Sequence, residues 1–369
     1  MLAELERHPG ARAVLGPALS GRAQPSHAYL FHGPGGAGKA AAARAFAADL
    51  LAAEEADPES ARHRALAGIH PDLTWVVPSG AHEVLVSDID GPVVAAASKT
   101  PFESSRRVFV IECADQLGDE AANRMLKTLE EPASFVHLIL ITDRLGDVLP
   151  TIRSRCQAVR FDAPAPHEIA AELEAAGTSH DTAVALARLS LGDAGRAREL
   201  SSPEGARLRD AAEAFARSAV RGKAASSAPW TALLEAVRAR GERVKQELED
   251  EAAVALEFLP RKERKRAETE WSDRIRRSRR RTETAALDLT LTLVAAWMLD
   301  LAVLEWRAED LVRNSDRLNR LEEDRGPGDR RVRRAVELVE DTRLRLPLNV
   351  SEELACEALA YRLEQVLNG

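Results

Sequence analysis

The sequence predicts an α/β domain with a parallel five-stranded sheet, followed by a region built of helices alone. Three observations lead to this fold class. Short apolar runs alternate with helical segments up to about residue 162, which is typical of a parallel sheet covered on both faces. A glycine-rich loop, GPGGAGKA, separates the first apolar run from the first long helix. Beyond about residue 205 the pattern is helical to the end.

The first elements surround the glycine-rich loop. Residues 11–20 predict a helix, and the apolar run AYLF at 28–31 predicts a short strand. The alanine-rich segment 39–53 predicts a helix, because alanine has the highest helix propensity. Strand, glycine loop and helix follow one another in the order that a phosphate-binding loop requires.

The next segments complete the α/β domain. Residues 86–101 and 119–132 have helical apolar spacing, and each ends at a proline, which cannot continue a helix. LPTIRSRC at 149–156 predicts a short helix. The other strands are predicted by the runs LTWVVP (73–78), RVFVIE (107–112), HLILIT (137–142) and AVRF (158–161).

Changes of pattern divide the chain into three predicted domains. An α/β nucleotide-binding-like domain covers residues 1–162 and ends where APAP interrupts the chain. Three short helical segments predict a small helical lid at 163–204, and 205–369 predict a separate all-helical domain. A length of 369 residues is sufficient for such domains.

Charge, cysteine spacing and apolar stretches limit the classes of protein to which this chain can belong. A net charge of −8 argues against a generally nucleic-acid-binding chain. The three cysteines lie far apart, which indicates reduced thiols in a cytoplasmic protein. The N-terminus has no apolar core of signal-peptide length. The most apolar stretch, 285–306, is interrupted by Asp288 and Asp300, so it predicts a buried helix rather than a membrane span.

The glycine-rich loop is a candidate nucleotide site. Its glycines allow backbone N–H groups to turn toward phosphate oxygens, and Lys39 can place its ammonium on the outer phosphates. The following helix adds its positive N-terminal end. Ala40 stands where the motif has the Ser or Thr that ligates magnesium. The candidate residues are Gly33, Pro34, Gly35, Gly36, Ala37, Gly38, Lys39 and Ala40.

A degenerate metal-and-water position follows the run RVFVIE. Phosphate-loop ATPases hold magnesium with an Asp at the end of such a strand, and here Glu112 and Cys113 occupy that end. Glu112 can reach a metal. Cys113 is a poor base, because a thiol cannot polarise water as a carboxylate does, and we interpret it as a small buried hydrophobe. With Ala40 and Cys113 both altered, hydrolysis by this chain is expected to be absent or very slow.

Arg155, in TIRSRC at 151–156, is a third candidate. An arginine exposed at the end of a short helix can reach the phosphate of a neighbouring subunit, where its charge stabilises phosphoryl transfer in trans. From these residues alone, a surface salt bridge is the better interpretation.

Together, HAYLFHGPGGAGK (27–39), ANRMLKTLEEP (122–132) and LPTIRSRC resemble the bacterial clamp-loader family of AAA+ proteins. The resemblance is specific from about Ser26 to Cys156 and weaker toward the C-terminus. There, LRLPLNVSEELACEAL (344–359) is similar to the last helices of the family's collar. The resemblance implies a five-stranded AAA+ module, a helical lid and a collar domain.

The resemblance also implies a role. Members of the family join through their collars into a ring of five, which opens a sliding clamp and places it on primed DNA. This chain is similar to a non-motor subunit of the DNA polymerase holoenzyme, a nucleotidyltransferase, with motor subunits of the gamma/tau type and a delta-type subunit as partners. Arg155 would be an arginine finger offered in trans, and Thr142 and Arg196 fall at the first and second sensor positions.

Cofactor expectations follow from the same resemblance. ATP or ADP, held without hydrolysis, is the expected occupant of the loop if the loop is occupied. Many subunits of this kind carry a four-cysteine zinc module, but residues 52–69 contain no cysteine. His63 alone cannot provide four ligands. We therefore expect no zinc.

Two charged features complete the inventory. Residues 261–281 contain eleven Lys or Arg against four Asp or Glu, a local net charge of +7. We interpret them as a solvated helix with acidic neighbours such as ELEDE (247–251); contact with nucleic acid or with an acidic partner is the alternative. Glu130 and Glu131 end a helix before a proline, and a structural role fits them better than an acid/base pair.

Three functions stay open at this stage. The first is a non-motor ring subunit that contributes Arg155 to a neighbour's ATP. The second is an active motor ATPase of the same family, which Lys39 and the intact loop favour and which Ala40 and Cys113 oppose. The third is an unrelated phosphate-loop protein, such as a nucleotide-binding scaffold.

Overall fold

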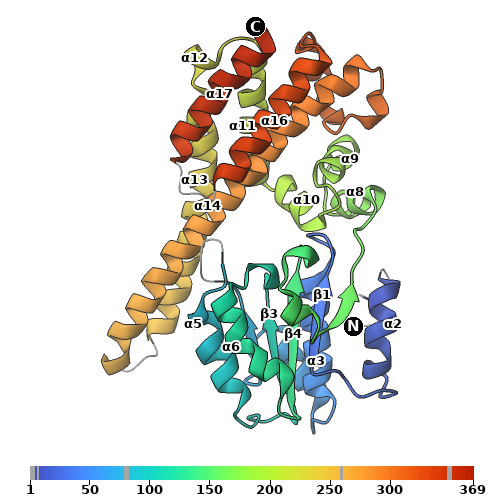
Figure 1. Cartoon of the computed structure of the whole chain (residues 1–369), viewed down its shortest axis with the longest axis vertical. Helices are drawn as coiled ribbons and strands as arrows, with labels where there is room; N and C mark the ends of the chain where they lie inside the picture. Colours follow the sequence, from blue (N-terminus) through green and yellow to red (C-terminus); the bar gives the residue numbers. More distant parts are fainter. Residues whose placement is uncertain (1–4, 6–7, 79–82, 258–260, 347–350) are drawn as a thin grey trace. The chain divides into compact units, whose positions relative to one another are not determined.

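A computed structural model describes residues 5, 8–78, 83–257, 261–346 and 351–369. The chain divides into two compact units, Met1–Pro164 and Ala165–Gly369 (Figure 1). The first unit is α/β and the second is helical, as the sequence predicts. The second unit contains both the segment expected as a lid and the segment expected as a collar, and the division into three domains stays a prediction.

The first unit contains the predicted five-stranded parallel sheet, in the order β2-β3-β4-β1-β5. Its strands are β1 Ala28–His32, β2 Leu73–Val76, β3 Arg107–Ile111, β4 Val136–Thr142 and β5 Gln157–Arg160. His32 pairs with Thr142, so β1 and β4 end side by side. The loops that follow β1 and β4 therefore meet at one edge of the sheet, where parallel α/β proteins bind ligands.

Helices cover both faces of this sheet. The long apolar strands alternate their side chains between two buried clusters, one beneath α2, α3 and α4 and the other beneath α5, α6 and α7. The helices are α2 Pro9–Leu19, α3 Lys39–Ala52, α4 Pro58–Leu66, α5 Val86–Ile89, α6 Asp119–Glu130 and α7 Pro150–Arg153, with short 3-10 turns at Ala114–Gln116 and Leu145–Asp147.

One predicted helix has an unexpected winding. The segment expected as a helix at 86–101 begins as α5 but continues as a π-helix over Asp90–Ala95. Pro92 lies inside this turn, and a proline lacks the N–H that an α-helix needs. The wider π turn accommodates it, as such turns do inside helices.

The second unit is a helical assembly with a single large hydrophobic cluster. Its helices are α8 Pro166–Ala175, α9 His180–Leu189, α10 Ala194–Ser201, α11 Pro203–Val220, α12 Ala224–Ser227, α13 Pro229–Glu257, α14 Arg261–Glu305, α15 Leu318–Glu323, α16 Asp329–Arg345 and α17 Glu352–Asn368, with 3-10 turns at Glu309–Leu311 and Ser315–Arg317. The collar-like motif 344–359 is described except for 347–350, which lie outside the described residues.

The apolar stretch 285–306 forms the C-terminal half of α14. Within the described residues, Ala267–Glu305 is long and apolar enough to cross a membrane by length and composition, but 83% of its most apolar window is buried in the protein. Trp297 is packed in the hydrophobic cluster of the second unit. This stretch is thus a buried helix, as predicted.

Candidate functional site: a phosphate loop and a surface arginine

The glycine-rich loop follows β1 at the carboxyl edge of the sheet. Gly33 has a φ of 146°, and a Cβ there would lie 2.1 Å from the carbonyl oxygen of Phe161, so no other residue fits. Gly38 has a φ of 80° and caps the start of α3. The loop therefore has the strand–loop–helix context that phosphate-binding loops require.

Lys39 turns back into its own loop. Its side chain is 4% exposed, and Nζ donates to the carbonyl oxygens of Gly33 at 2.7 Å and Pro34 at 2.5 Å. Nζ also lies 2.8 Å from Oδ1 of Asp143, the residue after β4. An ammonium has three protons, and these three oxygens account for them. A phosphate that reached Lys39 would have to replace one of these partners, and Asp143 is the anionic one.

Glu112 and Cys113 lie at the end of β3, as predicted. Oε1 of Glu112 accepts a hydrogen bond of 2.7 Å from Nε1 of Trp75, on the neighbouring strand β2. Cys113 has a left-handed backbone, with a φ of 54°, and its side chain is half-buried. The Glu112 carboxylate is thus held by the indole of Trp75.

A carboxylate that the sequence analysis missed contacts Thr142, the predicted first sensor. Oγ1 of Thr142 donates to Oδ1 of Asp115 at 2.7 Å. Arg144 donates to the other oxygen of Asp115 through Nε at 3.2 Å and Nη2 at 3.0 Å. Asp115 lies in the turn after β3 and Thr142 ends β4, so this network ties two neighbouring strand ends together. The only sequence signal was an acidic residue shortly after a buried strand.

Arg155 follows α7 and lies near the end of α6. Its Nη2 forms an ion pair with Oε1 of Glu130, and its Nη1 donates to the carbonyl oxygen of Thr151 at 2.8 Å and to Oγ of Ser154 at 3.3 Å. The Arg155 side chain is 33% exposed. These contacts hold the guanidinium at the surface of the first unit, and none of them belongs to the phosphate loop. Glu130 ends α6, as expected, and also contacts Arg155.

Arg196, at the predicted second sensor position, belongs to the second unit. It lies in the first turn of α10, where its backbone N–H donates to Oδ1 of Asp193 at 2.9 Å. This hydrogen bond is a helix cap. Arg196 and the phosphate loop therefore belong to different units of the chain.

Burial controls the titration of groups near the site. Desolvation lowers the pKa of His32, at the end of β1, and the nearby charges of Arg160 and Lys39 lower it further. Burial raises the pKa of the Cys156 thiol, beside Arg155, to about 12. Cys156 is therefore protonated at neutral pH, which excludes it as a thiolate nucleophile.

Metal ligands do not gather in the described part of the chain: no group of three or more His, Cys, Asp or Glu side chains is placed to hold an ion there. His63 lies on α4, the helix of the interval where related subunits would carry zinc cysteines. The absence of zinc stays a prediction, which metal analysis can test.

The parallel sheet order and the glycine-rich loop between β1 and α3 define a phosphate-loop module of the AAA+ class. A family model described as "DNA polymerase III, delta subunit" matches residues 18–165. The match covers the whole sheet and the helices on its two faces, except α2, of which it includes only the last two residues.

Individual relatives agree with this match. The DNA polymerase III subunit delta' of Pseudomonas aeruginosa is 41% identical over 143 residues, which cover 37% of this chain and 44% of that protein. The delta' subunit of Bacillus subtilis is 40% identical over 148 residues, covering 39% and 44%. The gamma/tau subunit of Mycobacterium tuberculosis is 30% identical over 148 residues, covering 37% and 24%. Residues 18–165 are thus similar to DNA polymerase III delta' subunits, and the chain spans less than half the length of these relatives.

Proposed function

We propose that this chain is a non-motor subunit of a bacterial clamp loader. It would assemble in the cytoplasm with motor subunits of the gamma/tau type and a delta-type subunit, and the complex would place a sliding clamp on primed DNA. The greater similarity to delta' subunits than to the gamma/tau subunit supports the non-motor role. Ala40 and Cys113, which replace a magnesium ligand and a water-activating carboxylate, support it further.

The observation that carries this proposal is the placement of Arg155. Its guanidinium is fixed at the surface by a carbonyl, a hydroxyl and the Glu130 carboxylate. A phosphate oxygen of a neighbour's ATP can take the place of Glu130, because arginine pairs with phosphate and with carboxylate in the same fork geometry. Arg155 would then supply positive charge where the neighbour's phosphoryl group is transferred.

Replacing Arg155 tests this role in the reconstituted loader. We expect Arg155→Ala to assemble normally and to lose DNA-stimulated ATP hydrolysis at the adjacent motor site, since arginine fingers contribute about 10³ to 10⁵ in rate. Arg153→Ala is the matched control, because Arg153 is an exposed arginine at the end of α7, two residues before Arg155, and we expect it to keep full activity. Unchanged hydrolysis in Arg155→Ala, with normal assembly, would exclude the proposed role.

We further propose that the loop holds ATP or ADP weakly at most and does not hydrolyse it. Phosphate must displace Asp143 from Lys39, so Asp143→Asn should raise the affinity of the isolated chain for ATP, and Lys39→Ala should abolish binding. Isothermal titration with ATP measures both. If Asp143→Asn leaves the affinity for ATP unchanged, phosphate and the Asp143 carboxylate do not compete for Lys39.

An active motor ATPase is the second candidate function, and the phosphate loop itself favours it. The isolated chain would then hydrolyse ATP, and the variant Lys39→Ala would not. Turnover of that kind would replace the non-motor proposal. Failure to co-purify with gamma/tau-type and delta-type subunits would instead favour an unrelated nucleotide-binding scaffold.

A further inference from the structure

The hairpin of α13 and α14 extends beyond the hydrophobic core of the second unit. Among the described residues, that core includes Val237 on α13 and resumes at Ala286 on α14. The hairpin between them, residues 238–285, is here called the arm. Ordering so long a segment costs conformational entropy, and no described residue of the arm belongs to the core cluster. A role in contacting another molecule accounts for its presence.

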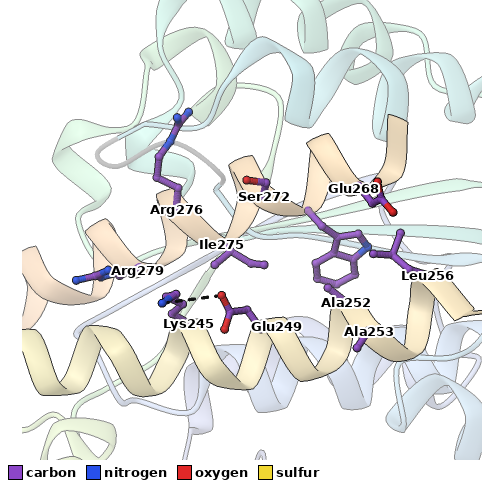
Figure 2. Close-up of a pocket in the computed structure, with 11 residues that line it drawn as sticks. Lys245, Glu249, Ala252, Ala253, Leu256, Glu268, Ser272, Ile275, Arg276 and Arg279 are labelled. Atoms are coloured by element: carbon purple, nitrogen blue, oxygen red, sulfur yellow. Dashed lines mark ion pairs between the residues drawn. The ribbon is translucent and has the colours of Figure 1, made fainter. Parts of the chain in front are cut away.

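Along α14 in the arm, Glu268 and Asp273 flank an exposed row of five cationic and hydroxyl side chains. These residues, called the stripe, are Lys265, Thr269, Ser272, Arg276 and Arg280, and all five are exposed. Their spacing of three or four residues places them on one face of the helix, over a length of about 22 Å at 1.5 Å per residue. Figure 2 shows Ser272 and Arg276 pointing away from α13, whereas Ile275 points toward it.

The arginines of the stripe remain exposed to solvent although they form ion pairs. Arg276 is 77% exposed, and its partner Asp273, at 2.9 Å, lies one turn earlier on the same helix; exposed pairs of this kind contribute little and are screened by salt. Arg280 lies 2.8 Å from Glu352 and is 48% exposed. Beside the stripe, the guanidinium of Arg274 lies over the ring of Trp271, 4.6 Å from its centre.

Acidic residues lie on both helices of the arm, and α13 also carries Arg238, Arg240, Arg243 and Lys245. Exposed carboxylates on α13 belong to Glu242, Glu247, Asp250 and Glu251. Residues 238–257 of α13 carry four Lys or Arg against six Asp or Glu, a net charge of −2, whereas residues 261–281 of α14 have a net charge of +7. An extended polyanion would be repelled by the first and attracted by the second, which gives it a single face to bind.

A hollow between the two helices does not select an acidic peptide instead. It has a volume of about 560 Å³ and an apolar floor that includes Trp271 and Ile275 (Figure 2). Its rim mixes both signs of charge, from Lys245, Arg276, Arg279, Glu249 and Glu268. The hollow therefore has no single sign of charge, whereas the stripe, which shares Ser272 and Arg276 with its rim, is basic.

We propose that the stripe binds the phosphate backbone of double-stranded DNA without reading its base sequence. Lys, Arg, Ser and Thr are the side chains that contact phosphates in protein–DNA complexes, and arginine matches phosphate geometry. A straight helix presents its donors in a rigid row. A duplex presents its phosphates in a rigid row as well, whereas a single strand would first have to be ordered.

The test measures binding of the isolated full-length chain to a labelled DNA duplex by fluorescence anisotropy over a range of salt concentrations. We expect the triple variant Lys265→Ala, Arg276→Ala, Arg280→Ala to bind about tenfold more weakly. The slope of log K against log salt should become shallower by about 2.7, because each lost phosphate contact removes about 0.9. Duplexes of different sequence should respond alike. The isolated chain is used, so the result does not depend on the clamp-loader role.

A matched control removes the same charge elsewhere. Arg330, Arg333 and Arg334 are exposed on α16 of the same unit, and their triple alanine variant should keep the duplex affinity. Equal losses in both variants would show an effect of net charge alone and would overturn the proposal. So would an unchanged affinity in the stripe variant, or single-stranded DNA bound as tightly as duplex. A stripe variant that binds duplex normally but fails to assemble with other subunits would overturn it in favour of a protein partner.

Folding of the stripe variant is checked by its thermal unfolding midpoint. The single variants Arg276→Ala and Arg276→Lys provide a second measurement of the salt dependence of duplex binding. Both leave the contact of Arg280 with Glu352 intact. Arg276→Lys should keep the salt slope, and Arg276→Ala should reduce it by about 0.9. Equal slopes for these two variants would contradict a phosphate contact at this position.

Discussion

His137 shows how one buried side chain couples the sheet to pH. It lies on β4 with 3% of its surface exposed, and its Nδ1 is 2.9 Å from the carbonyl oxygen of Ser26. Its ring stacks on that of His27, with centres 5.6 Å apart. Burial lowers the pKa of His137 to about 4, so the folded protein holds the neutral ring.

The stability of the first unit should therefore fall as the pH falls. An unfolded histidine takes up a proton near its ordinary pKa of 6.5, whereas folded His137 does so only near 4. The contribution of neutral His137 to the free energy of unfolding is complete above pH 6.5 and is lost as the pH falls from 6.5 to 4. The difference between the two pKa values corresponds to about 3 kcal/mol. Urea unfolding at several pH values measures this. His137→Gln should flatten the dependence in this window, and an equally steep curve in that variant would show that other groups cause it.

Lys39 and Arg155 show which residue-scale features sequence reasoning can reach. Both were predicted, because each lies in a short motif whose local geometry positions it. Their partners Asp143 and Glu130 were not assigned as partners. Asp143 lies more than a hundred residues from Lys39 in the chain, and only the pairing of β1 with β4 brings the two together.

At the scale of elements, α14 packs in the hydrophobic core of the second unit and also binds the turn at residues 313–314 through Asp300. Asp300 interrupts the most apolar stretch and is fully buried. Its carboxylate accepts from the backbone N–H of Arg313 at 3.0 Å, and from the backbone N–H and the side-chain amide of Asn314, both at 2.8 Å. Burial raises the pKa of Asp300 in spite of these donors. The charge that excluded a membrane span from the sequence is thus an anchor for the 313–314 turn.

Removing this anchor should destabilise the second unit. Asp300→Ala leaves three N–H donors without this acceptor, two from the backbone and one from the Asn314 side chain, and each unsatisfied buried donor costs about 1–3 kcal/mol. We expect a loss of about 3 kcal/mol or more in the free energy of unfolding, measured by the guanidinium midpoint. Asp300→Asn keeps one acceptor oxygen and should lose less. A midpoint of Asp300→Ala equal to that of the unmodified protein would contradict the anchoring role.

At the scale of the whole molecule, the chain combines an AAA+ module with a helical unit that carries a long arm. Residues 18–165 match the family model described as "DNA polymerase III, delta subunit". The phosphate loop and Arg155 lie inside the matched residues, and the arm lies in the second unit, outside them.

Metal content is a property of the whole molecule as well. We predict that the purified protein contains no zinc, because residues 52–69 lack cysteine and no metal-binding group of side chains is found in the described ranges. Elemental analysis after extensive dialysis measures this directly. One tightly bound zinc per chain would show that ligands come together in a way that neither the sequence nor the structure indicates.

The sequence by itself determined the fold class, the strands and helices, the phosphate loop and the arginine motif. These depend on local patterns of apolar spacing, glycine and proline, which act within about ten residues. The tertiary structure alone decided what those residues contact: Asp143 on Lys39, Asp115 on Thr142, Glu130 on Arg155, and the exposed stripe on α14. The physical reason is that strand pairing and helix packing bring distant segments together, and local patterns carry no record of which side chains then meet.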